Sequence, residues 1–376
     1  MRRLNLTLIG GVAAILTTPA SAQGMTLGVN THFEQGWPVS AYDKVASSQA
    51  QAIRDTVSWG KVEKLPGRFE FTKANSGFVD VACKRSIPVV LVILPRNKIY
   101  DGARAVFSPD GQRAFARYIG AVVDRFPCVT AIEIGNEING ATKNWPPPAQ
   151  KPAMYVSMLR AVRQELNRGH RKVVLLGGSW IGIVPEFHRR LFEAGELPLI
   201  DAVAIHPYVK PEKIGPEIDR LRQAMHANGG EKPIWATEFG NYYKTPEAAP
   251  PHALKVITLL SASSVKKAFW YALLDEPWYP NMGLYGRAGA KPALSTYRTT
   301  IRLLSAGNAH RITSRDPASF VYRFGNGPLV MWGSGRAFRL PAGAKVYDAR
   351  GQAIATPPTL SDEPVIVENA DMVQLR

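Results

Sequence analysis

The sequence lacks the features that would place it in several specialised classes. No block of like charge and no low-complexity run interrupts its 376 residues, of which 45% are hydrophobic and 20% charged. This composition predicts a globular protein with ample core, built as one large domain or as one large and one small domain. No histidine pair has zincin spacing, no nucleic-acid-binding motif is visible, and the turn after Val29 has no glycine-rich dinucleotide fingerprint. We therefore expect no metal, no organic cofactor and no nucleic-acid partner.

No long hydrophobic run is present either. The apolar run from Leu8 to Leu16 is shorter than the roughly 20 residues that a membrane anchor needs, so stable membrane insertion is not expected. Arg2 and Arg3 precede this run, and small residues follow it up to Ala22. The pattern predicts that residues 1–22 are a signal peptide, cleaved near Ala22, and that the protein is periplasmic or secreted.

Acidic residues are scarcer than basic ones. The chain has 30 Asp and Glu against 46 Lys and Arg, which gives a formal net charge of +16. The basic residues are scattered among acidic ones rather than clustered with aromatic residues, so charge favours an anionic polymer partner only weakly.

Cysteine is rare. Cys83 and Cys128 are the two cysteines of the chain, and export would make a disulfide between them chemically possible. Each lies shortly before an expected strand, which would place both at the end of the sheet opposite the carboxylates described below. A structural bridge and two free thiols both remain open, whereas the spacing fits neither a metal site nor a redox motif.

The chain contains eight short apolar stretches that alternate with helical ones. The third stretch is almost uniformly apolar, as expected for a strand buried on both faces. Asp110–Phe126 and Met154–Asn167 have apolar residues at the three- and four-residue spacing of amphipathic helices. Eight strands with intervening helices predict an α/β fold, a (β/α)₈ TIM barrel; a doubly wound sheet is the alternative. The expected strands are Met25–Val29, Ala50–Thr56, Pro88–Leu94, the start of Val129–Gly140, Lys172–Gly177, Asp201–His206, Pro233–Glu238 and Lys267–Ala272.

The pattern changes after about Ala306. Short β-like segments separated by glycine, proline and asparagine turns predict a small β-sandwich-like module. We therefore expect a barrel over residues 23–305 and a C-terminal β-rich module over residues 306–376.

Polar residues collect where the expected barrel strands end. In a (β/α)₈ barrel, active groups lie at the C-terminal ends of the strands. Strands four and seven, which end in Glu137 and Glu238, face each other across the barrel mouth, so the two carboxylates can converge. The candidate site residues are Glu137 and Glu238, with Asn136, Arg54, His32, His206, Tyr208 and Trp270 around them.

Two convergent carboxylates with aromatic residues nearby suit the cleavage of a glycosidic bond. One must be a protonated acid and the other an ionised nucleophile. Arg54 and Tyr208 could lower the pKa of the nucleophile, and Trp270 could offer an apolar face to a sugar ring. Glu133 is expected to point into the barrel and form a structural salt bridge.

The strand ends also carry a family resemblance. The chain resembles the clan A retaining glycoside hydrolases, most closely family 39 and related bacterial exopolysaccharide hydrolases, over about residues 25 to 305. The resemblance implies that Glu137 is the acid/base, Glu238 the nucleophile and Asn136 the ligand of the hydroxyl next to the reacting carbon. Gly135 and Ile138 depart from the pattern, since many clan members have Trp and Pro there. The matching segments are Ile53-Arg54-Asp55 with Trp59, Glu63, Gly67 and Phe71, Glu133-Ile134-Gly135-Asn136-Glu137, His206-Pro207-Tyr208 and Thr237-Glu238-Phe239-Gly240.

The expected function is therefore retaining hydrolysis of O-glycosidic bonds, with a polysaccharide or oligosaccharide as the partner. Endo cleavage of a bacterial exopolysaccharide is the expectation that the resemblance favours. A non-catalytic carbohydrate-binding barrel in polysaccharide export and transglycosylation at the same site are the alternatives. The sugar, its linkage and the oligomeric state are left open.

Overall fold

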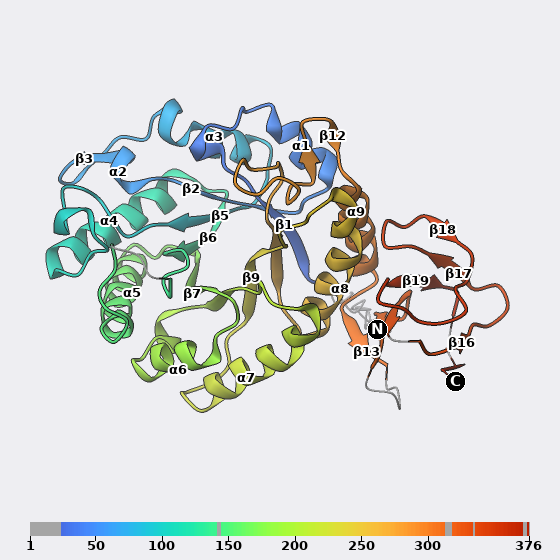
Figure 1. Ribbon diagram of the computed structural model, residues 1–376. Helices are drawn as coiled ribbons and strands as arrows, with labels where there is room; N and C mark the ends of the chain where they lie inside the picture. The colour runs from blue at the N-terminus through green and yellow to red at the C-terminus, as the bar shows by residue number, and fades with distance from the viewer. Residues whose placement is uncertain (1–23, 141–143, 313–317, 334, 371–373, 376) are drawn as a thin grey trace, which may run out of the picture.

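Eight parallel strands close into a barrel in the computed structural model, which describes residues 24–140, 144–312, 318–333, 335–370 and 374–375 (Figure 1). The predicted signal peptide lies outside the described residues. The ring closes where β1 pairs with β10, with Thr26 beside Lys267. The (β/α)₈ prediction is confirmed. The barrel strands are β1 (Thr26–Asn30), β2 (Ile53–Thr56), β5 (Val89–Ile93), β6 (Val129–Ile134), β7 (Val174–Ile181), β8 (Ala202–His206), β9 (Ile234–Phe239) and β10 (Lys267–Trp270).

Helices cover the outside of the barrel, as Figure 1 shows. In α4, Pro109 occupies the first turn, and the Ser108 side chain accepts a hydrogen bond from the Gly111 N–H at 3.0 Å, which caps the helix. Among the described residues, no helix has both the length and the apolar character needed to cross a membrane. The helices are α1 (Ala41–Ser48), α2 (Trp59–Val62), α3 (Lys73–Lys84), α4 (Pro109–Arg125), α5 (Lys151–Arg168), α6 (Pro185–Glu193), α7 (Ile214–His226), α8 (Ala249–Ala262) and α9 (Pro292–Ser305).

An antiparallel sheet follows α9 and forms a separate C-terminal module, as predicted. Its strand order is β13-β14-β15-β19-β17-β18. The module packs beside α8 and α9: the Ala309 N–H donates to Ser261 Oγ at 2.9 Å, and Arg302 pairs with Glu368 at 2.5 Å. The strands of this sheet are β13 (Ala309–Arg311), β14 (Ser319–Phe324), β15 (Leu329–Gly333), β17 (Lys345–Tyr347), β18 (Ala353–Ile354) and β19 (Val365–Glu368).

Three further strand pairs were not predicted, because each strand is only two or three residues long. They are β3 (Glu63–Leu65) with β4 (Arg68–Phe69), β11 (Tyr285–Gly286) with β12 (Gly289–Ala290), and β16 (Phe338–Arg339) with β20 (Gln374–Leu375).

A disulfide joins Cys83 and Cys128, whose Cα atoms lie 5.0 Å apart. Cys83 lies in the last turn of α3 and Cys128 immediately precedes β6. The bridge therefore lies at the N-terminal ends of the barrel strands, opposite the carboxylates.

Candidate active site

Side chains alternate along each barrel strand, and this alternation builds the site in two layers. An apolar layer inside the barrel consists of Ala52, Val90, Ala131, Leu176, Ala202, Ala204, Trp235 and Phe269. Moving two residues along a strand keeps the side chain on the same face, so a second layer lies above the first. That layer is mostly polar and includes Asn30, Arg54, Glu133, His206, Thr237 and Tyr271.

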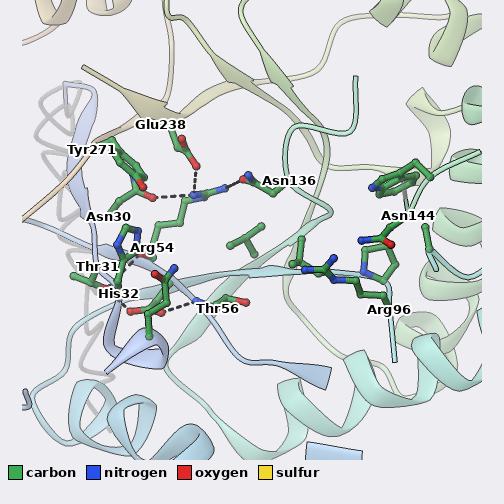
Figure 2. A pocket seen from close by; sticks show the side chains of 17 residues that line it. Asn30, Thr31, His32, Arg54, Thr56, Arg96, Asn136, Asn144, Glu238 and Tyr271 are labelled. Carbon is green, nitrogen blue, oxygen red and sulfur yellow. Dashed lines mark hydrogen bonds and ion pairs between the residues drawn. The ribbon is translucent and has the colours of Figure 1, made fainter. Parts of the chain in front are cut away.

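Arg54 on β2 is the centre of this polar layer. It is only 3% exposed, and its Nε lies 2.7 Å from Glu133 Oε2. Nη1 donates to Glu238 Oε1 and to Asn30 Oδ1, both at 2.8 Å, and Nη2 donates to Asn136 Oδ1 at 3.0 Å. Burial alone would lower the pKa of Arg54, but the charges of Glu133 and Glu238 raise it above its ordinary value. One buried cation therefore holds side chains from three other barrel strands, β1, β6 and β9, or the loops that follow them (Figure 2).

Glu133 on β6 is the buried counter-charge of Arg54. Burial favours its neutral form, but the charge of Arg54 and hydrogen bonds with His206 and Arg54 lower the pKa of Glu133 to about 2. The Thr237 hydroxyl donates to Glu133 Oε1 at 2.9 Å. Because both of its oxygens accept hydrogen bonds inside the barrel, Glu133 holds Arg54 in position beneath the two candidate catalytic glutamates.

The two candidate catalytic glutamates meet above this layer. Glu238 lies near the end of β9, where Arg54 donates to its Oε1 at 2.8 Å and the Tyr208 hydroxyl donates to its Oε2 at 2.9 Å. Glu137 lies just beyond β6 with a more exposed side chain, 30% against 9% for Glu238. One oxygen of each carboxylate and one His206 nitrogen lie within 4.8 Å of one another. Both carboxylates are therefore close enough to contact the same bond of a bound molecule.

His206, at the end of β8, is buried between three carboxylates. Its Nδ1 lies 3.1 Å from Glu137 Oε1 and 3.5 Å from Glu238 Oε2, and its Nε2 lies 3.7 Å from Glu133 Oε1. Burial alone would lower the pKa of His206, but the charge of Glu238 and hydrogen bonds with Glu133 and Glu137 raise it to about 9. The ring is therefore an imidazolium near neutral pH, and its charge offsets the repulsion between the carboxylates.

Glu137, His206 and Glu238 are also the set of described residues that could approach a metal ion together. A metal would have to displace the proton of His206, because a protonated ring offers no free electron pair. It would also compete with Arg54, which already pairs with Glu238. The arrangement is better suited to proton transfer and nucleophilic attack than to metal binding.

A cavity of about 320 Å³ opens beside the carboxylates. His32, Arg54, Asn136 and Glu238 line it, whereas Glu137, His206 and Tyr208 are not among the lining residues. His32 Nδ1 pairs with the Glu276 carboxylate. The other lining residues include Asn30, Thr31, Asp55, Arg96, Asn144, Trp145 and Tyr271.

The prediction that Trp270 offers a face to a sugar ring was wrong. Trp270 is 1% exposed, packs edge-on against Phe239, and donates from Nε1 to the Met282 carbonyl at 2.9 Å. Because Phe269 points into the barrel, Trp270 points outward, and the next inward residue is Tyr271. Tyr271, immediately after β10, is the aromatic residue that lines the cavity, and alternation assigns it this direction once Phe269 is known to point inward.

Three further tryptophans, Trp145, Trp180 and Trp278, differ in their exposure. Trp180 lies within β7 and is fully buried, because this strand continues to Ile181 rather than ending at Gly177. Trp145 lines the cavity, and Trp278 is 53% exposed. Trp145 and Trp278 are therefore accessible to a substrate, and Trp180 is not.

Gly135 departs from the family pattern for a local reason. Its φ is +79°, and a Cβ at this position would lie 2.7 Å from Ile138 Cγ2. Glu137 itself has a φ of +47°, which is uncommon for a residue with a side chain. The turn after β6 therefore combines a glycine with a left-handed glutamate, and this geometry turns Glu137 toward His206.

Similar folds occur among glycoside hydrolases. A family 39 glycoside hydrolase from Bacteroides cellulosilyticus WH2 has a TM-score of 0.75 at 18% identity, covering 92% of this chain and 81% of that one. A monomeric β-xylosidase from Caulobacter crescentus CB15 has a TM-score of 0.61 at 12% identity, covering 92% and 96%. A conserved exported protein from Bacteroides fragilis has a TM-score of 0.62 at 12% identity, covering 94% and 98%.

No protein-family model and no curated protein matches the sequence. At these identities the structural likeness establishes the fold, and the resemblance to family 39 enzymes is confirmed at that level.

Proposed function

We propose that the protein is a retaining O-glycoside hydrolase that uses Glu238 as nucleophile and Glu137 as acid/base. The approach of the two carboxylates, with an oxygen of each within 4.8 Å, carries this proposal. Retaining glycosidases hold their carboxyl groups about 5 to 5.5 Å apart, whereas inverting enzymes separate them by about 6.5 to 9.5 Å to admit a water. An oxygen-to-oxygen approach within 4.8 Å fits the closer, retaining arrangement.

The surroundings of the two glutamates assign their roles. Glu238 accepts hydrogen bonds from Arg54 and Tyr208, which hold its carboxylate in one orientation for nucleophilic attack. Glu137 has the more exposed side chain and faces His206, so it can exchange a proton with the leaving group and then with water. Glu238 attacks the anomeric carbon while Glu137 protonates the departing oxygen. Glu137 then deprotonates a water, which breaks the bond to Glu238 and releases the sugar.

Asn136 is positioned to bind the substrate. Arg54 donates to Asn136 Oδ1 at 3.0 Å, so the orientation of the amide is held. The amide nitrogen has no partner among the described residues and lies on a side chain that lines the cavity. It can therefore donate to the hydroxyl next to the reacting carbon.

The proposed substrate is a polysaccharide, cleaved internally. Exposed aromatic rings continue beyond the catalytic cavity: Tyr242 and Trp278 are 57% and 53% exposed, and Tyr242 and Tyr279 have ring centroids 6.4 Å apart. Such rings suit additional sugar units of a long chain. The expected signal peptide, and a similar fold in a conserved exported protein, support a periplasmic or secreted enzyme that acts on bacterial exopolysaccharide.

Reducing-end release from a panel of neutral and acidic bacterial exopolysaccharides tests the proposal. Wild type should release reducing ends, and Glu238→Gln should lower the rate at least about 10³-fold because it removes the nucleophile. Release that persists unchanged in Glu238→Gln would refute the assignment. Binding of the polymers without turnover by wild type would favour a carbohydrate-binding barrel.

A further inference from the structure

Arg96 stands in the cavity wall on a firmly held loop. The loop follows β5, and its backbone is anchored on both sides of Arg96. The Pro95 carbonyl accepts from the Val106 N–H at 2.9 Å, and the buried Asn97 side chain donates to the Glu63 carbonyl at 2.8 Å. Arg96 itself is exposed and lines the cavity. The anchors fix the point from which its side chain extends along the cavity wall.

The other basic side chains of the cavity wall are already paired. Arg54 is engaged by Glu133 and Glu238, and His32 is paired with Glu276. Arg96 forms no ion pair and no side-chain hydrogen bond with any residue that the structure describes.

Asp55, the remaining acidic residue of the cavity wall besides Glu238, does not neutralise Arg96. Its Oδ2 accepts from the Thr31 hydroxyl at 2.7 Å and from the Phe33 N–H at 2.9 Å. Its Oδ1 accepts from the Thr56 N–H at 2.7 Å. The cavity therefore presents one positive charge to a ligand.

We propose that Arg96 binds the carboxylate of a uronic acid unit, so that the enzyme is selective for acidic polysaccharides. This inference rests on the proposed function and names its substrate class. A guanidinium presents two parallel N–H donors that match the two oxygens of a carboxylate, whereas a neutral sugar would leave its charge unmatched.

The neighbours of Arg96 suit a sugar ring. Asn144 and Trp145 line the same cavity, and the Ala105 N–H donates to the Asn144 carbonyl at 2.7 Å, which ties the two loops together. Figure 2 shows Arg96 and Asn144 on the side of the cavity away from Glu238 and Tyr271. An acidic unit held there would place its carboxylate at a distance from the reacting carboxylates.

The same loop supplies a matched control. Lys98 is exposed, has the same charge and does not line the cavity. Arg104 is less suitable, because its guanidinium lies over the Phe107 ring at 4.6 Å. Lys98→Gln therefore changes the net charge as Arg96→Gln does, without touching the proposed subsite.

The test compares glucuronic-acid-containing polysaccharides with the same polymers after chemical reduction of their carboxyl groups, which preserves the linkages. Wild type should have a kcat/KM at least about tenfold higher on the native polymers, since hydrogen bonds to charged groups are the strong ones. Arg96→Gln should abolish this preference, Arg96→Lys should keep part of it, and Lys98→Gln should retain it. Equal cleavage of native and reduced polymers, or a preference that survives Arg96→Gln, would overturn the inference while leaving the hydrolase intact.

Binding of glucuronate and glucose, measured by titration, separates this inference from the proposed function. If wild type cleaves no polymer, the hydrolase proposal fails. Tighter binding of glucuronate than of glucose, lost in Arg96→Gln but not in Lys98→Gln, would still support the acidic subsite. Equal binding of both sugars would overturn it.

Discussion

Replacing Arg54 with methionine tests the buried charge network directly. The substitution keeps a side chain of similar length but leaves Glu133 fully buried beside Glu238 without their shared cation. The pKa of Glu133 is lowered from an ordinary 4.5 to about 2, which corresponds to roughly 3 kcal/mol of stabilisation, and the charge of Arg54 is the largest cause of this lowering. Breaking a buried ion pair by removing one partner costs roughly 3 to 5 kcal/mol. Arg54→Met should therefore lower the free energy of unfolding at pH 7 by roughly 3 to 5 kcal/mol.

The loss should depend on pH with a definite sign. Because the pKa of Glu133 is lowered in the folded protein, its stabilisation is present above about pH 4.5 and is lost as the pH falls through about 2. In Arg54→Met, burial raises the pKa of Glu133, so protonation relieves the buried charge. The stability difference between wild type and variant should shrink as the pH is lowered from 7 toward 4. Urea unfolding followed by tryptophan fluorescence measures it.

Two controls sharpen the Arg54 prediction. Adding Glu133→Gln to Arg54→Met should recover roughly 1 to 2 kcal/mol, because the uncompensated charge is removed. Arg113→Met, which breaks an exposed pair with Asp110, should change stability by less than about 1 kcal/mol. A loss below about 1 kcal/mol for Arg54→Met, or simple additivity in the double variant, would refute the reasoning.

Three other predictions concern separate parts of the molecule. The pKa of His206 is raised from its ordinary 6.5 to about 9 in the folded protein. The protonated ring therefore contributes stability that is fully present below about pH 6.5 and is lost as the pH rises through 9. Thermal unfolding should show wild type losing stability relative to His206→Gln between about pH 7 and 9.5. Replacing Cys83 and Cys128 with alanine should lower the free energy of unfolding in urea by roughly 4 kcal/mol, because the bridge spans a sequence separation of 45. The value of kcat should stay unchanged, because the bridge lies at the end of the barrel opposite the carboxylates. Trp278→Ala should raise KM for long oligosaccharides but not for the shortest cleaved ones, and an equal effect on both would argue against an extended binding surface.

The barrel could be predicted because its strands are apolar runs that stand out from amphipathic helices. The positions of Glu137 and Glu238 followed from the same pattern, since each comes where an apolar strand ends. Because active groups of a (β/α)₈ barrel lie at the C-terminal ends of its strands, the proximity of the two carboxylates could be predicted without knowledge of loop geometry.

The direction of individual side chains could not be predicted as well. Trp270 and Tyr271 are adjacent aromatic residues at the end of a strand buried on both faces, so hydrophobicity does not show which one points inward. The extension of β7 depends on a bulge between Gly178 and Trp180, where Ser179 has a φ of +64°, and no local sequence pattern indicates it. Arg96 reaches the cavity through loop contacts with Val106 and Glu63, which are set by tertiary structure.

The stereochemistry of the first product tests the central claim most directly. Proton NMR of a reaction followed from its earliest minutes reports the anomeric configuration of the newly formed reducing end before mutarotation. Double displacement through Glu238 predicts that the product initially has the same configuration as the cleaved bond, with no product from Glu238→Gln. An initial product of opposite configuration would contradict the account, because it would show direct attack by water on the anomeric carbon, with no covalent intermediate on Glu238.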